Sequence, residues 1–145
     1  DILLYQERFE GYKKALEEAD IPLDPNIIIH DVYGWEDSYK AMSMLLERGF
    51  KPDAVFATSD PKAIGVIRAI KDHGLSVPDD ISVMGFDDLD MVALLDPPLT
   101  TVSQPFYEMG VVACERLIKI IEAKRKPKPV VKTLPCKLKI RKSVK

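Results

Sequence analysis

Polar side chains follow three short apolar runs of this sequence, each at the point where the run ends. The pairs are His30 with Asp31, Ser59 with Asp60, and Asp87 with Asp88. If the runs are neighbouring parallel strands, their carboxyl ends meet at one edge of a sheet, where open α/β sheets bind ligands. Carboxylates at that edge would accept hydrogen bonds from ligand hydroxyls, and Arg8 could add a forked guanidinium donor. These residue types therefore predict a binding site for a polyhydroxylated small molecule.

An aromatic side chain near these groups would favour a sugar or a nucleoside. Tyr33 and Trp35 lie close to Asp31 in the sequence and could cover the face of a ring. Charge-assisted hydrogen bonds would meanwhile hold the hydroxyls of that ring.

Structural roles compete with ligand binding at some of these positions. Asp60 precedes Pro61, an order typical of a helix N-cap, so we interpret Asp60 as a cap. Asp88 and Asp90 are interpreted as stabilising the start of a short helix, and His30 is equally consistent with a surface residue. Arg8 and Asp87 are left as the strongest ligand candidates.

Helical and extended patterns alternate along the chain and must position these groups. Apolar periodicity and cap residues predict helices over residues 6–19, 36–48, 60–73 and 105–123, with a short helix within 88–95. Extended segments are expected at residues 27–30, 54–58, 81–85, 99–103, 130–134 and 137–140. Short alternation of this kind implies βαβ units. We therefore expect an α/β fold with a three-layer, doubly wound, mostly parallel sheet.

Bulk composition is that of an ordinary globular protein. The 145 residues are 46% hydrophobic and 30% charged, enough for one domain with its own core. No apolar run approaches the ~20 residues of a membrane span, and no basic segment typical of a signal peptide is visible at the start. Cys114 and Cys136 lack metal-ligand spacing. We expect a reducing, cytoplasmic environment, and the initial Asp1 suggests a trimmed chain.

Positive charge is concentrated at the C-terminal end. Residues 119–145 hold eleven lysines and arginines and one acidic residue, Glu122. This run could be an electrostatic footprint for nucleic acid. Alternatively, residues 124–129 are a solvated linker and the alternation in 137–141 marks a half-buried edge strand. We favour the second interpretation and expect no specific DNA contact here.

Several irregular motifs resemble those of the lactose/galactose repressor (LacI/GalR) family of bacterial transcription regulators. Residues 81–88 read Ile-Ser-Val-Met-Gly-Phe-Asp-Asp, and Pro-Leu-Thr-Thr-Val and Gln-Pro follow at 98–102 and 104–105. Residues 8–12 resemble the family's Arg-x-x-Gly-[Phe/Tyr] segment, and residues 58–65 resemble Asn-Asp-x-x-Ala-x-Gly. The resemblance covers nearly the whole chain, but only the second half of the family's effector-binding region.

The resemblance implies a periplasmic-binding-protein-like fold of type I, with an effector held between two lobes. It assigns effector contacts to Arg8 and Asp87. Ser59 stands where the family has an asparagine, which replaces an amide by a single hydroxyl. Val32 stands at a ring-stacking aromatic position, so stacking would either be weakened or shift to the neighbouring Tyr33. Asp31 completes the predicted ligand set.

The resemblance also implies a two-fold dimer and an organisation of the chain. The predicted dimer patch consists of Ile64, Ile67, Met91 and Leu94. Residues 1–145 would form the C-terminal effector-binding and dimerisation lobe, with a crossing strand and helix at 99–123 and final strands at 130–140. The DNA-binding helix-turn-helix and most of the N-terminal lobe would be absent. Implied partners are a sugar-like or nucleobase-like effector, a second copy, and DNA only through that absent domain.

Other functions stay open at this point. A sugar-binding protein of a transport system would share the fold. An enzyme could use Asp87 and Asp88 as an acid–base pair or a metal site, although adjacent residues at a strand end tend to point apart. Some relatives bind a phosphorylated protein corepressor. No Cys/His cluster accompanies the carboxylates, so we expect no metal. We also expect no catalysis, membrane contact or cofactor.

The helix expected over residues 105–123 carries an apolar stripe. Its members are spaced three or four residues apart: Phe106, Met109, Ala113, Leu117 and Ile120. A stripe of this size is expected to be buried. The helix would fold back on its own lobe, pair with another copy, or swap between chains, and we favour pairing.

Overall fold

Three parallel strands and one antiparallel edge strand form the sheet that organises this chain. The computed structural model describes residues 3–123 and 128–145. The strands are β1 (Ala54–Phe56), β2 (Ser82–Asp87), β3 (Thr100–Ser103) and β4 (Lys137–Lys139). They lie side by side in the order β1-β2-β3-β4. β1, β2 and β3 run parallel, and β4 pairs antiparallel with β3.

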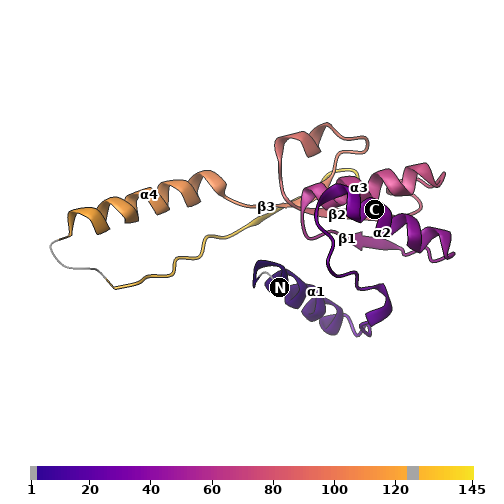
Figure 1. Ribbon diagram of the computed structural model, residues 1–145, viewed down its shortest axis with the longest axis horizontal. Helices are drawn as coiled ribbons and strands as arrows, with labels where there is room; N and C mark the ends of the chain where they lie inside the picture. Colours follow the sequence, from indigo (N-terminus) through magenta and orange to yellow (C-terminus); the bar gives the residue numbers. More distant parts are fainter. Residues whose placement is uncertain (1–2, 124–127) are drawn as a thin grey trace.

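Helices connect the strands and cover both faces of the sheet (Figure 1). The α-helices are α1 (Leu3–Glu18), α2 (Gly34–Glu47), α3 (Asp60–Asp72) and α4 (Phe106–Glu122), and the 3-10 turns are η1 (Pro25–Ile27) and η2 (Asp90–Leu94). α1 lies on one face, where the Tyr12 ring stacks 6.5 Å from the Phe56 ring. α3 lies on the other face, against Gly85 of β2. The expected three-layer α/β fold with a mostly parallel sheet is confirmed.

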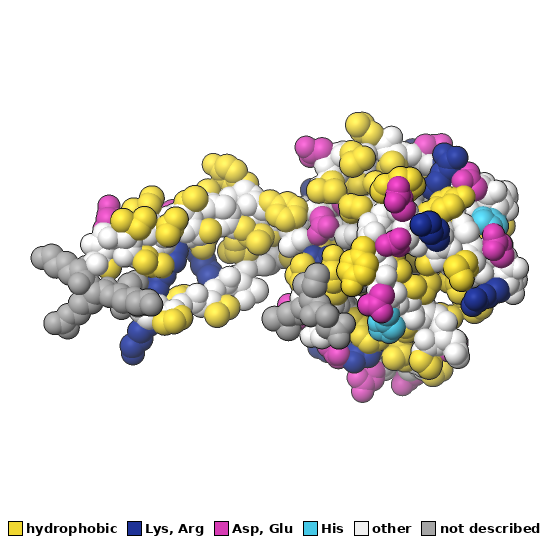
Figure 2. Space-filling view, in the orientation of Figure 1, with side chains coloured by type: hydrophobic (Ala, Val, Ile, Leu, Met, Phe, Trp, Pro, Cys, Tyr) yellow, Lys and Arg dark blue, Asp and Glu magenta, His cyan; other side chains and the backbone are white. Residues whose placement is uncertain are grey.

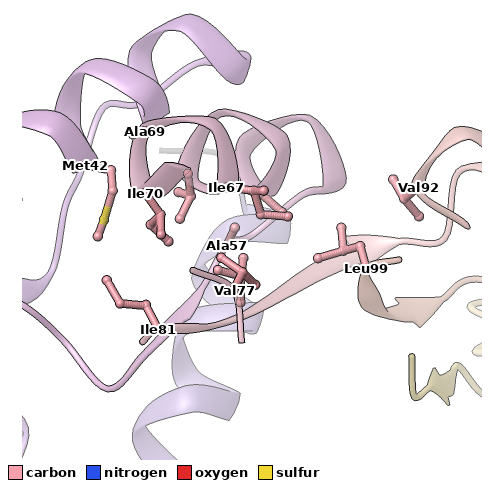
Figure 3. Packing of buried hydrophobic residues seen from close by; sticks show 12 residues of the cluster. Met42, Ala57, Ile67, Ala69, Ile70, Val77, Ile81, Val92 and Leu99 are labelled. Atoms are coloured by element: carbon pink, nitrogen blue, oxygen red, sulfur yellow. The ribbon is translucent and has the colours of Figure 1, made fainter. Parts of the chain in front are cut away.

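The hydrophobic core lies between the sheet and the pair α2 and α3. Figure 3 shows side chains from both helices and from the strands pointing into this space. Its largest fully buried apolar members are Ile70, Ile81, Leu99, Val83 and Val92. Gly65 of α3 permits the close contact between the two helices, because a Cβ atom there would collide with the Trp35 carbonyl and the Ser38 hydroxyl.

Two predicted strands are absent from the structure. Residues 28–30 follow η1 as unpaired chain, and residues 130–134 pair with nothing in the sheet. The first begins with a turn instead, because Asp24 accepts a hydrogen bond from the Asn26 N–H, and Pro25 favours that turn. The second follows α4 back toward the sheet and reaches a pairing position only at Lys137. β-Branched composition predicted both strands, but a strand also needs a partner.

The C-terminal edge differs from expectation in its burial. β4 forms at the sheet edge, as predicted, but all three of its residues are exposed. The expectation of a half-buried strand was therefore wrong: Leu138 is 55% and Ile140 is 77% exposed. Residues 124–127 of the expected basic linker lie outside the described residues.

Helix α4 projects away from the sheet and from the other helices (Figure 1). No residue of α4 is buried, and apolar side chains gather along the projecting arm (Figure 2). Folding back on its own lobe, one of the three predicted outcomes, is therefore contradicted: β3 leads into α4 in a direction away from the sheet. None of the described helices combines the length and the apolarity that a membrane crossing requires.

Candidate functional site

Arg8 lies at the carboxyl-terminal edge of the parallel strands. α1 presents its side chain there, only 6% exposed. One guanidinium nitrogen, Nη1, donates to the Thr58 carbonyl just beyond β1, and Nη2 lies 3.4 Å from Asp87 Oδ1. The guanidinium carbon also lies 3.8 Å from the centre of the Phe86 ring. The predicted pairing of Arg8 with the end of β2 is thus present, and an aromatic face supports the cation.

Asp87 and Asp88 turn in different directions from the end of β2. Both have positive backbone φ angles, 120° and 61°. Asp87 Oδ1 accepts a hydrogen bond of 2.7 Å from Gln104 Nε2, next to Arg8. Asp88 Oδ1 instead accepts one of 2.6 Å from Arg141 Nη2. With their carboxylates held by separate partners, this geometry does not suit an acid–base pair.

Asp88 belongs to the scaffold and not to the short helix that the sequence suggested. Partial burial acts to raise the pKa of Asp88, but the hydrogen bonds from Arg141 and Ser103 outweigh it and leave that pKa lowered. η2 begins at Asp90 with no side-chain cap, so the predicted helix-start role of Asp88 was wrong.

Asp60 has a different role from the predicted helix cap. It is the first residue of α3 and is 0% exposed, while the N-cap position is Ser59. Its Oδ1 accepts from the Thr101 hydroxyl at 2.6 Å, and its Oδ2 accepts from the Leu89 N–H at 2.8 Å. Burial raises the pKa of Asp60, and these two hydrogen bonds offset part of the increase. Asp60 therefore ties α3 to β3 and to the loop after β2.

The other predicted ligand residues make no hydrogen bond or ion pair with Arg8 among those that the structure describes. Ser59 caps α3 in an extended conformation without a side-chain hydrogen bond. Asp31, Val32 and Tyr33 lie between η1 and α2. No described hydrogen bond or ion pair joins them to Arg8, Asp87 or Gln104. Tyr33 is 68% exposed, so its ring is available for stacking. Their roles as ligands stay predictions.

Two contributors to the site, Gln104 and Lys62, were not predicted from the sequence as site residues. Gln104 lies in the Gln-Pro motif, and its amide holds Asp87. Lys62, in the first turn of α3, donates to the Thr58 hydroxyl at 2.9 Å, and its Nζ lies 4.2 Å from the centre of the Tyr5 ring. The spacing of Thr58 and Lys62, four residues apart at a helix start, is the only local signal for that contact.

An open groove of about 640 Å³ runs beside Arg8 between α1 and the strands. Apolar side chains provide most of its surface, and Glu7, Arg8 and Gln104 provide polar groups. The apolar and aromatic lining includes Leu4, Tyr12, Phe56, Met84 and Phe86. Cys136 also borders it, and Cys114 and Cys136 are both free and exposed. Within residues 3–123 and 128–145, no group of three or more His, Cys, Asp or Glu side chains is placed to hold a metal ion. The combination of an apolar surface with a few convergent polar groups is typical of small-molecule sites.

The predicted dimer patch is only partly on the surface. Leu94 is 86% and Met91 is 55% exposed on η2. Ile64 is half-buried and packs against the core. Ile67 is only 6% exposed and belongs to the hydrophobic core of its own chain, so its placement in a surface patch was wrong.

Comparison with known proteins identifies what the chain resembles. The periplasmic binding protein-like domain family matches residues 4–144. The HTH-type transcriptional repressor PurR of Histophilus somni is 41% identical over 138 residues, which cover 95% of this chain and 41% of PurR. The ribose operon repressor of Haemophilus influenzae is 41% identical over 117 residues, covering 81% of this chain and 35% of the repressor. The chain thus spans less than half the length of these relatives.

Solved structures agree with the sequence comparison. The dimeric Lac repressor with an 11-residue C-terminal deletion superposes with a TM-score of 0.87 at 29% identity, over 97% of this chain and 50% of the repressor chain. A LacI family transcriptional regulator from Enterococcus faecium with bound ribose superposes with a TM-score of 0.83 at 33% identity, over 94% of this chain and 50% of that one. The chain therefore belongs to the periplasmic binding protein-like domain family, in the form found in LacI-family transcriptional regulators.

Proposed function

We propose that this chain is the C-terminal effector-binding and dimerisation lobe of a transcriptional regulator. A small sugar-like or nucleobase-like effector would bind at the carboxyl-terminal edge of the strands. Binding would shift an equilibrium between lobe arrangements, and a DNA-binding domain elsewhere in the protein would respond. The lobe itself would perform no catalysis and would work in the cytoplasm, where the DNA is.

The observation that carries this proposal is the convergence of Arg8, Asp87 and Gln104. Three elements far apart in the sequence, α1, β2 and the segment after β3, bring these side chains together. Arg8 offers donors, Asp87 offers an acceptor and Gln104 offers both, which is the set needed to hold ring hydroxyls. The adjoining groove supplies an apolar surface for the ring.

The relatives of this chain favour a role in regulation over a role in transport. PurR and the ribose operon repressor, named above, are transcriptional repressors. The Lac repressor, 29% identical over 97% of this chain, has also been solved as a dimer bound to operator and an anti-inducer. In our proposal, this chain likewise pairs with a second copy and reaches DNA only through another domain.

Paired substitutions in the full-length protein test the ligand site. Isothermal titration with D-ribose, D-glucose, sucrose, adenine and adenosine would first identify a binding effector. A hydrogen bond to a charged group contributes about 1.5–3 kcal/mol, so Arg8→Ala and Asp87→Ala should each weaken that effector roughly ten- to hundredfold. The exposed residues Arg48 and Asp79 provide controls, since Arg48→Ala and Asp79→Ala make the same chemical changes away from the site. Undiminished affinity in both site variants would refute the assignment.

A further inference from the structure

A second cation lies beside Arg8 at the proposed site. Lys62 extends from the first turn of α3, is half-buried, and donates to the Thr58 hydroxyl. Arg8 donates to the carbonyl of the same residue, Thr58. Both cations also lie over the Tyr5 ring, with Lys62 Nζ at 4.2 Å and the Arg8 guanidinium carbon at 5.7 Å from its centre. α1 and α3 thus bring two positive charges to one small region.

In the part of the chain that the structure describes, these two cations have a single anionic partner between them, Asp87. Arg8 is paired with Asp87, at the long distance of 3.4 Å. Asp87 Oδ1, the same oxygen, also accepts the shorter bond from Gln104. Lys62 takes part in none of the described ion pairs, and its described hydrogen bond goes to a neutral hydroxyl. Asp88 is committed to Arg141, and Asp60 accepts from Thr101 and Leu89.

Arg8 retains an unused donor as well. Its Nε is buried and has no hydrogen-bond partner, although the side chain is only 6% exposed. An unsatisfied buried donor is costly, and more so when it belongs to a charged group. The pKa of Lys62 is lowered. Burial is the larger cause, and the nearby charge of Arg8 is the second. An anion bound by both cations would favour the charged form of Lys62 and offset its repulsion from Arg8.

We propose that the effector carries an anionic group, a phosphate monoester or a carboxylate, which Lys62 and Arg8 bind together at the start of α3. This inference rests on the proposed function, because it places the charged end of the effector in the same site. Lys62 is the specificity-determining residue in this arrangement. The sequence motif around Ser59 and Asp60 leaves position 62 open, so the resemblance assigned it no role. Asp87 and Gln104 then remain for the hydroxyls of the effector.

Matched pairs of compounds test the charge preference in the full-length protein. Isothermal titration would compare D-ribose with D-ribose 5-phosphate, D-glucose with D-glucose 6-phosphate, D-glucose with D-gluconate, and adenosine with AMP. The anionic member of at least one pair should bind at least tenfold more tightly than its neutral partner. Lys62→Met should remove most of that preference, whereas Lys62→Arg should retain it.

The controls separate a charge preference from a loss of folding or a general loss of charge. Lys40→Met makes the same substitution at an exposed position of α2 and should leave the preference intact. Thermal unfolding of each variant checks that the fold persists. Equal or tighter binding of the neutral compounds, or a preference that survives Lys62→Met, would overturn the charge inference while the proposed function stands. Failure of every compound to bind would count against the proposed function and this inference together.

Discussion

Removal of the Asp60 carboxylate should destabilise the whole fold, because this one side chain joins three separate segments. The carboxylate is fully buried and accepts hydrogen bonds from the Thr101 hydroxyl and the Leu89 N–H. In Asp60→Ala both donors lose their acceptor, and Thr101 is itself 0% exposed. Each unsatisfied donor costs about 1–3 kcal/mol, so the free energy of unfolding should fall by roughly 2–6 kcal/mol.

Asp60→Asn should cost less and should reveal the ionisation of the native carboxyl. The asparagine carbonyl can accept from Leu89, and the Thr101 hydroxyl can rotate to accept from the new amide. Because one hydrogen bond is retained and the other is reversed, the substitution should cost about 1–2 kcal/mol. Because the pKa of Asp60 is raised in the folded state, its contribution to stability is fully present below the unfolded value near 3.8 and declines as pH rises through the folded pKa. The deficit of Asp60→Asn relative to the native protein should therefore shrink as the pH rises above 3.8.

Urea unfolding at a series of pH values provides the assay, with the slope m used to check that the transition is comparable between variants. Asp79→Asn, at an exposed position, controls for the removal of an acid elsewhere. The reasoning would be refuted by an Asp60→Ala protein as stable as the native one. A deficit of Asp60→Asn that grows with pH would show that burial does not dominate the environment of this carboxyl.

Two further predictions concern packing and assembly. Gly65→Ala should lower the free energy of unfolding by about 1–3 kcal/mol, because the added Cβ collides with the backbone of α2. Gly11 has open space around it, so Gly11→Ala should cause no such loss. Thermal unfolding compares the two variants. If the proposed dimer forms through η2, Leu94→Glu should give a monomer in light scattering, because Leu94 is 86% exposed, while Leu23→Glu should remain dimeric. A folded Leu94→Glu dimer would place the interface elsewhere.

Local sequence patterns predicted most helices and the parallel strands, but they failed where distant partners decide. Asp60 followed by Pro61 has the pattern of a helix start, and α3 does begin there. The partners of its side chain lie 29 and 41 residues away, at Leu89 and Thr101, so no local pattern could reveal that Asp60 is a buried bridge. Residues 27–30 have the composition of a strand, yet composition cannot show that the sheet offers them no partner.

The candidate site shows the same division. Arg8 and Asp87 were predicted from residue types, from the strand end and from the family resemblance, and the structure places them together. Lys62 and Tyr5 were missed, because their contact depends on α1 and α3 meeting across the end of the sheet. Ile67 was misplaced for a related reason: on a helix with one exposed and one buried face, apolar character alone does not distinguish an interface residue from a core residue.

The turn after β2 links the proposed site to the far end of the chain. Positive φ angles at Asp87 and Asp88 are unfavourable for residues with a Cβ atom and need support from their surroundings. Arg141 supplies that support, since it binds the Asp88 carboxylate and also donates to the Leu99 carbonyl. Ser143, two residues further on, is fully buried and bridges the backbone of β2 and β3. The orientation of Asp87 toward Arg8 and Gln104 thus depends on residues more than 50 positions later in the sequence, whose lysine- and arginine-rich composition suggested only a solvated edge.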